Sequence, residues 1–387
     1  MTETRLTAEL AELAAAGLTR RRRVLDSPCG RIAAVDGKNV LNFASNDYLG
    51  LAGNAEIAQA MADGATQWGA GSGASHLVSG HLAPHEALET SIAAFVDFPH
   101  ALTFSTGYLA NLAIVPTLAS RGAMIFSDKL NHASLIDAMQ LAKASGAETQ
   151  RYPHCDMAAL EKLLAASSAP NKIIVSDAVF SMDGDLAPLP ILFALAERFD
   201  AWLVIDDAHG FGVLGPQGKG SLAHFNLPAS PRILLMGTLG KAAGVGGAFV
   251  AGSATAIEFL LQRARSYIFT TAAPPAIACA LSKSLQIIEH GDALRAKLFA
   301  NIARLRDGLG SLPWQLLPSA TAIQPLIVGD NEATLALAKA LWERGLWVPA
   351  IRPPTVPKGT ARLRISISAA HTAADIDQLI HALKELA

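Results

Sequence analysis

The sequence predicts an α/β protein with a mainly parallel central sheet, helices on both faces of that sheet, and a smaller C-terminal α+β domain. Three observations support this fold class. Short apolar runs alternate with helical segments between residues 101 and 250, which is typical of parallel sheets. Pro274-Pro275 then interrupts the pattern, because consecutive prolines stop regular structure. After this break, the strands and helices form a separate, shorter set.

Each expected element follows from its pattern of apolar residues. Leucines at near-helical spacing predict an N-terminal helix over residues 4–19, and Asp36-Gly37 between two apolar runs predicts a β-hairpin. The chain then divides into an N-terminal helix and hairpin (1–45), a large domain (46–273) and a small domain (274–387). The expected strands are 101–104, 124–126, 173–175, 202–205, 233–236 and 247–250 in the large domain, and 322–328, 347–351 and 362–366 in the small one.

Composition excludes several classes of function. Hydrophobic residues make up 51% and charged residues 17% of the 387, so a large core can form. A net charge of −2 argues against a nucleic-acid partner or a membrane surface. The three cysteines are far apart, the first residues lack a signal-peptide pattern, and no apolar run approaches the roughly 18 residues that span a bilayer. We therefore expect a soluble cytoplasmic protein.

Two neighbouring strands deliver reactive side chains at the points where they end. Asp206, Asp207 and His209 follow the strand 202–205, and Thr238 and Lys241 follow the strand 233–236. The carboxyl ends of parallel strands meet at one edge of the sheet, where ligands bind. An acid, an imidazole and a lysine at this edge suit a pyridinium cofactor that carries an aldehyde: the acid pairs with the ring nitrogen and the lysine forms a Schiff base. Asp206 directly follows its strand, so we favour it over Asp207.

The surroundings of Lys241 also favour this chemistry. Its neighbours are small and uncharged, and poor solvation lowers the pKa of an amine, which leaves it free to react with a carbonyl. Upstream, Gly107 stands at a strand-to-helix turn, where backbone N–H groups at a helix N-terminus can bind phosphate.

Other common sites do not fit. Lys241 is followed by Ala242, so the sequence lacks the hydroxyl of a phosphate-binding P-loop, and it also lacks a nucleophile elbow and a dinucleotide-binding glycine pattern. His81 and His85 are four residues apart, as zinc ligands can be, but we count no third ligand with them and expect no metal site.

Several motifs together resemble the α-oxoamine synthases, a family of fold type I pyridoxal-phosphate (PLP) enzymes. The resemblance extends over nearly the whole chain and implies a transferase that works as a homodimer with sites at the interface. One departure is His76, where many relatives have arginine. The motifs are Asn42–Gly50, Gly71-Ser-Gly73, His132-Ala-Ser134, Val179–Gly184, Asp206-Asp-Ala-His-Gly210 and Thr238-x-x-Lys241.

The resemblance implies a role for each matching residue. Lys241 binds PLP covalently and serves as the base at the amino-acid Cα, and His132 stacks on the ring and assists at the acyl carbonyl. Asn46 and Arg364 bind the amino-acid carboxylate, and Arg20 and Thr355 contact the acyl substrate, although the run Arg20–Arg23 leaves the register open. The remaining cofactor contacts are Gly107, Tyr108 and Thr238 at the phosphate, Asp206 at the ring nitrogen, and Ser181 and His209 at the ring hydroxyl.

Two segments of the tail, 322–330 and 351–364, are similar to family members that join L-alanine to a pimeloyl thioester in biotin biosynthesis. The alternatives are members that join glycine to acetyl-CoA, an aminotransferase-like enzyme on the same fold, and a binding scaffold. The sequence leaves open whether coenzyme A or a carrier protein holds the acyl group, and how far the loops close on substrate.

Overall fold

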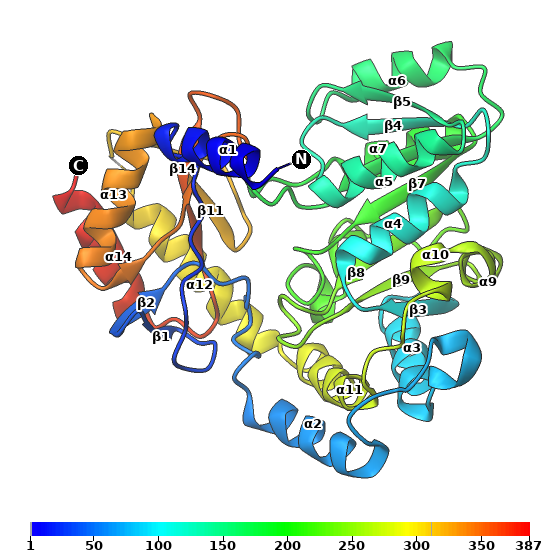
Figure 1. The fold of residues 1–387 in the computed structure, drawn as a ribbon, viewed down its shortest axis with the longest axis horizontal. Coiled ribbons are helices and arrows are strands. Elements are labelled where there is room, and N and C mark those ends of the chain that lie inside the picture. Colours follow the sequence, from blue (N-terminus) through cyan, green and yellow to red (C-terminus); the bar gives the residue numbers. More distant parts are fainter. Residues whose placement is uncertain (1, 311) are drawn as a thin grey trace.

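A seven-stranded sheet forms the centre of the larger of two lobes in the computed structural model, which describes residues 2–310 and 312–387 (Figure 1). β9 runs antiparallel to both of its neighbours, β3 and β8, and the other neighbouring strands pair in parallel, so the sheet is mainly parallel, as predicted. The order across the sheet is β3 (His100–Phe104), β9 (Ala248–Gly252), β8 (Ile233–Thr238), β7 (Ala201–Asp206), β6 (Lys172–Asp177), β4 (Met124–Asp128) and β5 (Glu148–Tyr152).

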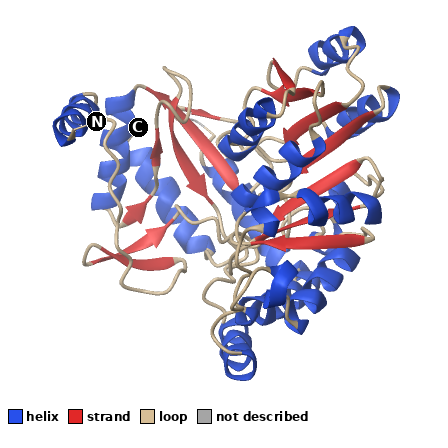
Figure 2. Cartoon of the chain, turned by 45° about the vertical axis from the view of Figure 1, so that its right-hand side comes forward, coloured by secondary structure: helices blue, strands red, loops and turns tan. Residues whose placement is uncertain are grey.

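Helices cover both faces of this sheet (Figure 2). Successive side chains of a strand point to opposite faces, and in β7 Leu203 and Ile205 enter one hydrophobic core while Val204 enters another. Burial on both faces explains why the inner strands are continuous apolar runs. One core includes α4 (Gly107–Leu118), α5 (Ala133–Ala144), α9 (Ala254–Arg263) and α10 (Arg265–Ile268); the other includes α3 (Ala83–Phe95), α6 (Met157–Ala166), α7 (Leu189–Arg198), α8 (Ser221–His224) and α11 (Pro275–Glu289).

The smaller lobe combines the N-terminal hairpin with the tail of the chain (Figure 1). The predicted hairpin is present, and its turn residues Asp36 and Gly37 have φ values of 49° and 76°, as a two-residue hairpin turn requires. The lobe consists of β1 (Ile32–Val35), β2 (Lys38–Asn42) and β12 (Leu346–Trp347) in one sheet, β10 (Gln315–Leu316), β11 (Ile323–Gly329), β14 (Ala361–Ser366) and β13 (Ala350–Ile351) in a second, and α12 (Asp292–Gly308), α13 (Asn331–Glu343) and α14 (Ala373–Glu385).

Several elements differ from the predicted ones. The edge strand β5 was not predicted, and the expected strand 347–351 consists of two short pieces, β12 and β13. The N-terminal helix α1 (Glu3–Ala15) ends before residue 19, and none of its residues is buried. The division at residues 45 and 273 stays a proposal, since α11 packs against α2 (Ala55–Trp68) and α3 while α12 leads into the smaller lobe. No helix among the described residues is long and apolar enough to cross a membrane.

Candidate active site

A cavity of about 210 Å³ lies at the carboxyl ends of the parallel strands. The structure brings all eight residues predicted to bind the cofactor to its wall, although their roles stay a prediction. The lining residues are Gly107, Tyr108, His132, Ser134, Asp177, Ser181, Asp206, Ala208, His209, Met236, Thr238 and Lys241.

Lys241 is the amine of this cavity. It follows β8, and its Nζ lies 3.0 Å from His209 Nε2. Burial lowers the pKa of Lys241 to about 8, although the carboxylate of Asp206 opposes this shift. A substantial fraction of the side chain is therefore a neutral amine near pH 8, which is the form that reacts with an aldehyde.

The two adjacent acids after β7 have different surroundings. Asp206 lines the cavity and accepts a hydrogen bond of 2.7 Å from Asn111 Nδ2 and one of 3.0 Å from the Ala208 N–H. Asp207 is buried away from the cavity and accepts two hydrogen bonds from Ser221. The geometry therefore favours Asp206 as the partner of a ring nitrogen.

The N-terminus of α4 supplies donors to the same cavity. Thr106 caps the helix by accepting a hydrogen bond from the Leu109 N–H, and Gly107 is the first helical residue. A Cβ at Gly107 would lie 3.9 Å from Thr238, so the two residues are neighbours. Backbone N–H groups and a hydroxyl at a helix N-terminus form a binding site for a phosphate.

His132 forms another part of the wall, at the N-terminus of α5. Its Nδ1 lies 2.7 Å from Ser134 Oγ, and its backbone N–H donates to the carboxylate of Asp177. Burial lowers the pKa of His132, so its ring is neutral near pH 7. The fixed, uncharged ring lines the cavity, and a second ring could stack on it there.

A chain of hydrogen bonds connects Lys241 with the residues predicted to bind the amino-acid carboxylate. Tyr48 donates to Asn46 Oδ1 over 3.1 Å, so its oxygen is free to accept from His209 Nδ1, 2.6 Å away. His209 Nε2 then accepts from Lys241. Arg364 Nη1 donates to the same Asn46 oxygen over 3.0 Å, while its Nε donates to the Ser181 carbonyl.

The two residues predicted to contact the acyl substrate lie elsewhere. Arg20 and Thr355 are exposed, and neither lines the cavity. The neighbours Arg21 and Arg23 form ion pairs with Asp36. The cavity therefore contains the predicted cofactor residues but not these two expected substrate contacts.

The sequence analysis missed several polar residues of the site, among them Asn111 and Asp177. Asn111 lies on the apolar helix α4 and holds both Asp206 and Ser134. An amide among Ala110, Leu112 and Ala113 is a signal that could have identified it, because buried polar groups need partners. Asp177 ends β6 as Asp206 ends β7, and burial raises its pKa well above the usual range.

His154 joins two acids behind the Ser181 loop. Its Nδ1 lies 3.0 Å from Asp128 and its Nε2 2.8 Å from Asp185. Burial alone would lower the pKa of His154, but the two carboxylates outweigh burial and raise it to about 12. The bridge holds the segment that carries the Ser181 carbonyl, and therefore also supports Arg364.

Comparisons with known proteins identify the family of this chain. The family model of class I and II aminotransferases matches residues 38–383. The chain belongs to this family. Within it, the chain is 80% identical over 387 residues to the 8-amino-7-oxononanoate synthase of Dechloromonas aromatica (strain RCB), and the match covers 100% of both chains.

Solved structures of two similar proteins agree with this fold. A serine palmitoyltransferase from S. paucimobilis with a bound PLP–myriocin aldimine has a TM-score of 0.91 at 30% identity, covering 98% of this chain and 96% of the other. An 8-amino-7-oxononanoate synthase from Francisella tularensis has a TM-score of 0.77 at 31% identity, covering 90% and 98%. The expected fold type and α-oxoamine synthase family are confirmed.

Proposed function

We propose that this chain is an 8-amino-7-oxononanoate synthase of biotin biosynthesis, which condenses L-alanine with a pimeloyl thioester and releases CO₂ and the free thiol. The observation that carries this proposal is the match at 80% identity along the entire chain. The cavity supports it, because an amine, a buried acid and a phosphate-binding helix N-terminus surround one space.

PLP is the cofactor, and the residues of the cavity fit it. When bound, PLP supplies a protonated ring that draws electrons from the Cα of an amino acid and so eases the breaking of bonds there. Asp206, held by Asn111, would keep the ring nitrogen protonated. Gly107, Tyr108 and Thr238 would bind the phosphate, with His132 against the ring face. Ser181 and His209 would contact the ring hydroxyl.

Lys241 has two proposed tasks. Its amine would hold the cofactor aldehyde before L-alanine arrives and would then take the proton from the alanine Cα. The pKa of about 8 suits both tasks, because the amine is readily deprotonated and can return the proton later. His209 lies 3.0 Å away and can accept a hydrogen bond from the amine, which orients it.

Asn46 and Arg364 would bind the carboxylate of L-alanine. Arg364 is 5% exposed and is held by Asn46, Ser181 and Ser366, so its guanidinium is fixed before substrate arrives. These contacts use Nε and Nη1. The guanidinium would donate a charge-assisted hydrogen bond to the substrate carboxylate.

The acyl substrate would enter from the side of Arg20 and Thr355, and His132 would move a proton at the thioester carbonyl oxygen. We propose that Arg20 binds the distal carboxylate of the pimeloyl group. Arg20 and Thr355 are both exposed, so binding of the substrate would have to order the segments that carry them.

We also propose that the protein is a homodimer. The glycine-dense loop 69–81 supports this proposal, because glycines allow two backbones to approach closely. Sedimentation equilibrium would test it.

Release of thiol from pimeloyl-CoA, measured with and without L-alanine, tests the function. We expect release that depends on L-alanine and a product with the mass of 8-amino-7-oxononanoate. Turnover of glycine with acetyl-CoA, but not of L-alanine with pimeloyl-CoA, would assign the alternative reaction instead. Repeating the assay with a pimeloyl carrier protein decides which thioester is used.

A further inference from the structure

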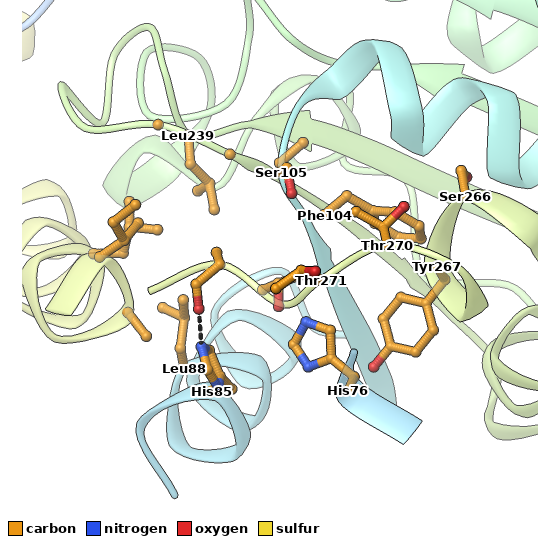
Figure 3. A pocket seen from close by; sticks show the side chains of 18 residues that line it. His76, His85, Leu88, Phe104, Ser105, Leu239, Ser266, Tyr267, Thr270 and Thr271 are labelled. Atoms are coloured by element: carbon orange, nitrogen blue, oxygen red, sulfur yellow. Dashed lines mark hydrogen bonds between the residues drawn. The ribbon is translucent and has the colours of Figure 1, made fainter. Parts of the chain in front are cut away.

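Three histidines meet outside the cofactor cavity. His76, His81 and His85 each place one ring nitrogen within 4.8 Å of the other two. The Nδ1 atoms of His76 and His81 are 2.8 Å apart. Figure 3 shows His76 and His85 on one side of a cavity, with Tyr267 beside the His76 ring. The sequence analysis considered only the pair His81 and His85, and the structure adds the third ring.

Local backbone geometry brings these rings together. Residues His76–Gly80 form a single π-helical turn, which is wider than an α-helical turn and returns the chain so that His81 lies beside His76. A Cβ at Gly80 would come within 2.0 Å of the Ala74 carbonyl oxygen, so the turn requires glycine there. His85 then follows in the first turn of α3, which begins at Ala83. π-Helical turns of this kind are frequent at functional sites.

In two of the rings, the nitrogen that faces away from the cluster already makes a hydrogen bond of the kind that metal-bound histidines make. His81 Nε2 lies 3.0 Å from Glu86 Oε2, and His85 Nε2 lies 2.8 Å from the Ala273 carbonyl oxygen. A histidine that binds a metal through one nitrogen usually donates its other N–H to a carboxylate or a carbonyl, which fixes the tautomer. The Nδ1 atoms of His81 and His85 are then the ones without a proton.

The third ring is also held in place. His76 stacks on Tyr267 with ring centroids 5.0 Å apart and an angle of 10° between the planes. Burial lowers the pKa of His76 to about 4, so the ring is an uncharged imidazole at neutral pH. Glu86 and Glu89 each place a carboxyl oxygen within 4.8 Å of a ring nitrogen of His81. Burial raises the pKa of Glu89 to about 7, so this carboxyl is only partly charged at neutral pH.

We propose that His76, His81 and His85 form a binding site for a divalent transition-metal cation, with Zn²⁺ as the best-suited ion. Three imidazoles suit Zn²⁺, and a water molecule can complete a tetrahedron. Zn–N bonds of about 2.0–2.1 Å place ligand nitrogens about 3.4 Å apart, so small movements of the side chains suffice. The cation would replace two existing hydrogen bonds, one between His76 Nδ1 and His81 Nδ1 and one from the Leu82 N–H to His85 Nδ1.

A cation here would fasten two distant segments. The loop that carries His76 already contacts residues 271–273, through Ala272 N–H to the Ala74 carbonyl and Ser72 Oγ to the Ala273 carbonyl. His85 reaches the same segment. Because the cation binds only when these segments are in place, binding stabilises the folded state. The proposal does not depend on the reaction that the enzyme catalyses.

The test is a zinc titration of the tag-free holoenzyme after treatment with a chelator, by isothermal titration calorimetry, with bound metal counted by mass spectrometry. We expect one Zn²⁺ per chain and a higher melting temperature with zinc. His76→Ala and His81→Ala should each weaken binding by at least about 10-fold, and Glu86→Gln by about 10-fold, because outer partners of ligands contribute to affinity.

His381→Ala is the matched control, because His381 pairs with Glu385 on α14 and, among the described residues, belongs to no group of converging ligands. It should leave the titration unchanged. X-ray absorption at the zinc edge should show three imidazole nitrogens. A sulfur ligand would instead assign the metal to Asp128, His154 and Cys155, a converging group that includes a thiol, and would overturn the proposal.

Two further results would overturn the proposal: no saturable uptake of zinc up to about 1 mM, or equal affinity in the wild type, His76→Ala and His81→Ala. His85 is left unchanged in these variants, since it also bonds the backbone at the start of α3. Circular dichroism checks folding, and His76→Gln, which keeps a side chain against Tyr267, replaces His76→Ala if the alanine variant is unstable.

Discussion

Lys241 and Arg20 are both basic residues that we expect at the reaction site, but the structure surrounds them differently. Lys241 follows a central strand, lies in a cavity and is 3.0 Å from His209. Arg20 is exposed and follows α1, none of whose residues is buried. The hydrophobic core therefore positions the cofactor end of the site before any ligand binds, whereas the acyl end must lose conformational freedom when substrate arrives.

The largest effect should come from Lys241→Ala. Without the amine, neither covalent attachment of the cofactor nor proton transfer at Cα is possible, so kcat should fall by at least about 10³-fold. Thiol release from pimeloyl-CoA measures this, and borohydride reduction should no longer fix the cofactor to the protein. Lys219→Ala, which removes only an ion pair with Asp97, is the control. A reduced covalent adduct in Lys241→Ala would contradict the assignment.

The adjacent acids give a matched pair. Asp206→Ala should lower kcat by about 10²-fold or more, since nothing would keep the ring nitrogen protonated. Asp207→Ala should keep kcat within a few-fold but lower the free energy of unfolding by about 1–3 kcal/mol, because the buried Ser221 N–H loses its acceptor. Urea unfolding and steady-state kinetics separate the two outcomes. The reverse pattern would mean that Asp207 is the cofactor's partner.

Arg20→Ala should act at the acyl end. Losing a charged hydrogen bond to a carboxylate should raise the KM for the pimeloyl thioester by about 10-fold and leave the KM for L-alanine unchanged. Thr355→Ala should raise the same KM by only about 2–3-fold, because the lost group is neutral. The control is Arg22→Ala. If Arg22→Ala has the larger effect, the register within the arginine run is shifted.

His154→Ala should have a small effect on catalysis. The Ser181 loop would loosen behind Arg364, so the KM for L-alanine should rise about 2–5-fold, and His154→Asn, which keeps one hydrogen bond, should recover part of the loss. An equal rise in the KM for the thioester would show a general loss of structure rather than a loss of support for Arg364.

The same bridge predicts a dependence of stability on pH. The folded-state pKa of His154, about 12, lies above its usual value of about 6.5. The contribution of the bridge is therefore complete below about pH 6.5 and falls as the pH rises toward 12. Urea midpoints should differ more between wild type and His154→Ala at pH 6 than at pH 9, and a constant difference would contradict the ion pair.

Buried strands and the residues at their ends could be predicted from the sequence. Trp202–Ile205 and Ile233–Met236 are apolar because both faces of the sheet are covered, and the side chains that follow them must lie at one edge. This reasoning is sufficient to bring Asp206, His209, Thr238 and Lys241 together. Gly107 could be predicted for a similar reason, since it stands where a strand turns into a helix.

The remaining features depend on contacts that no local pattern records. β5 lies at the edge of its sheet, where four of its five residues are exposed or half-buried, so it lacks the apolar signal of an inner strand. Asn111 and Tyr48 act through partners far away in the sequence, Asp206 and His209. The His76 cluster depends on a π-helical turn, for which the sequence gives no periodic signal.

The strand pair β2 and β12 has a consequence for how the protein is made. Leu41 pairs with Leu346, and Asn42 with Trp347, so the first hairpin to leave the ribosome receives its third strand only when synthesis is nearly complete. Until then one edge of the hairpin is open to pairing with other chains. Loss of the C-terminal segment, by a premature stop codon or a protease, would therefore expose this edge and favour aggregation of the truncated protein.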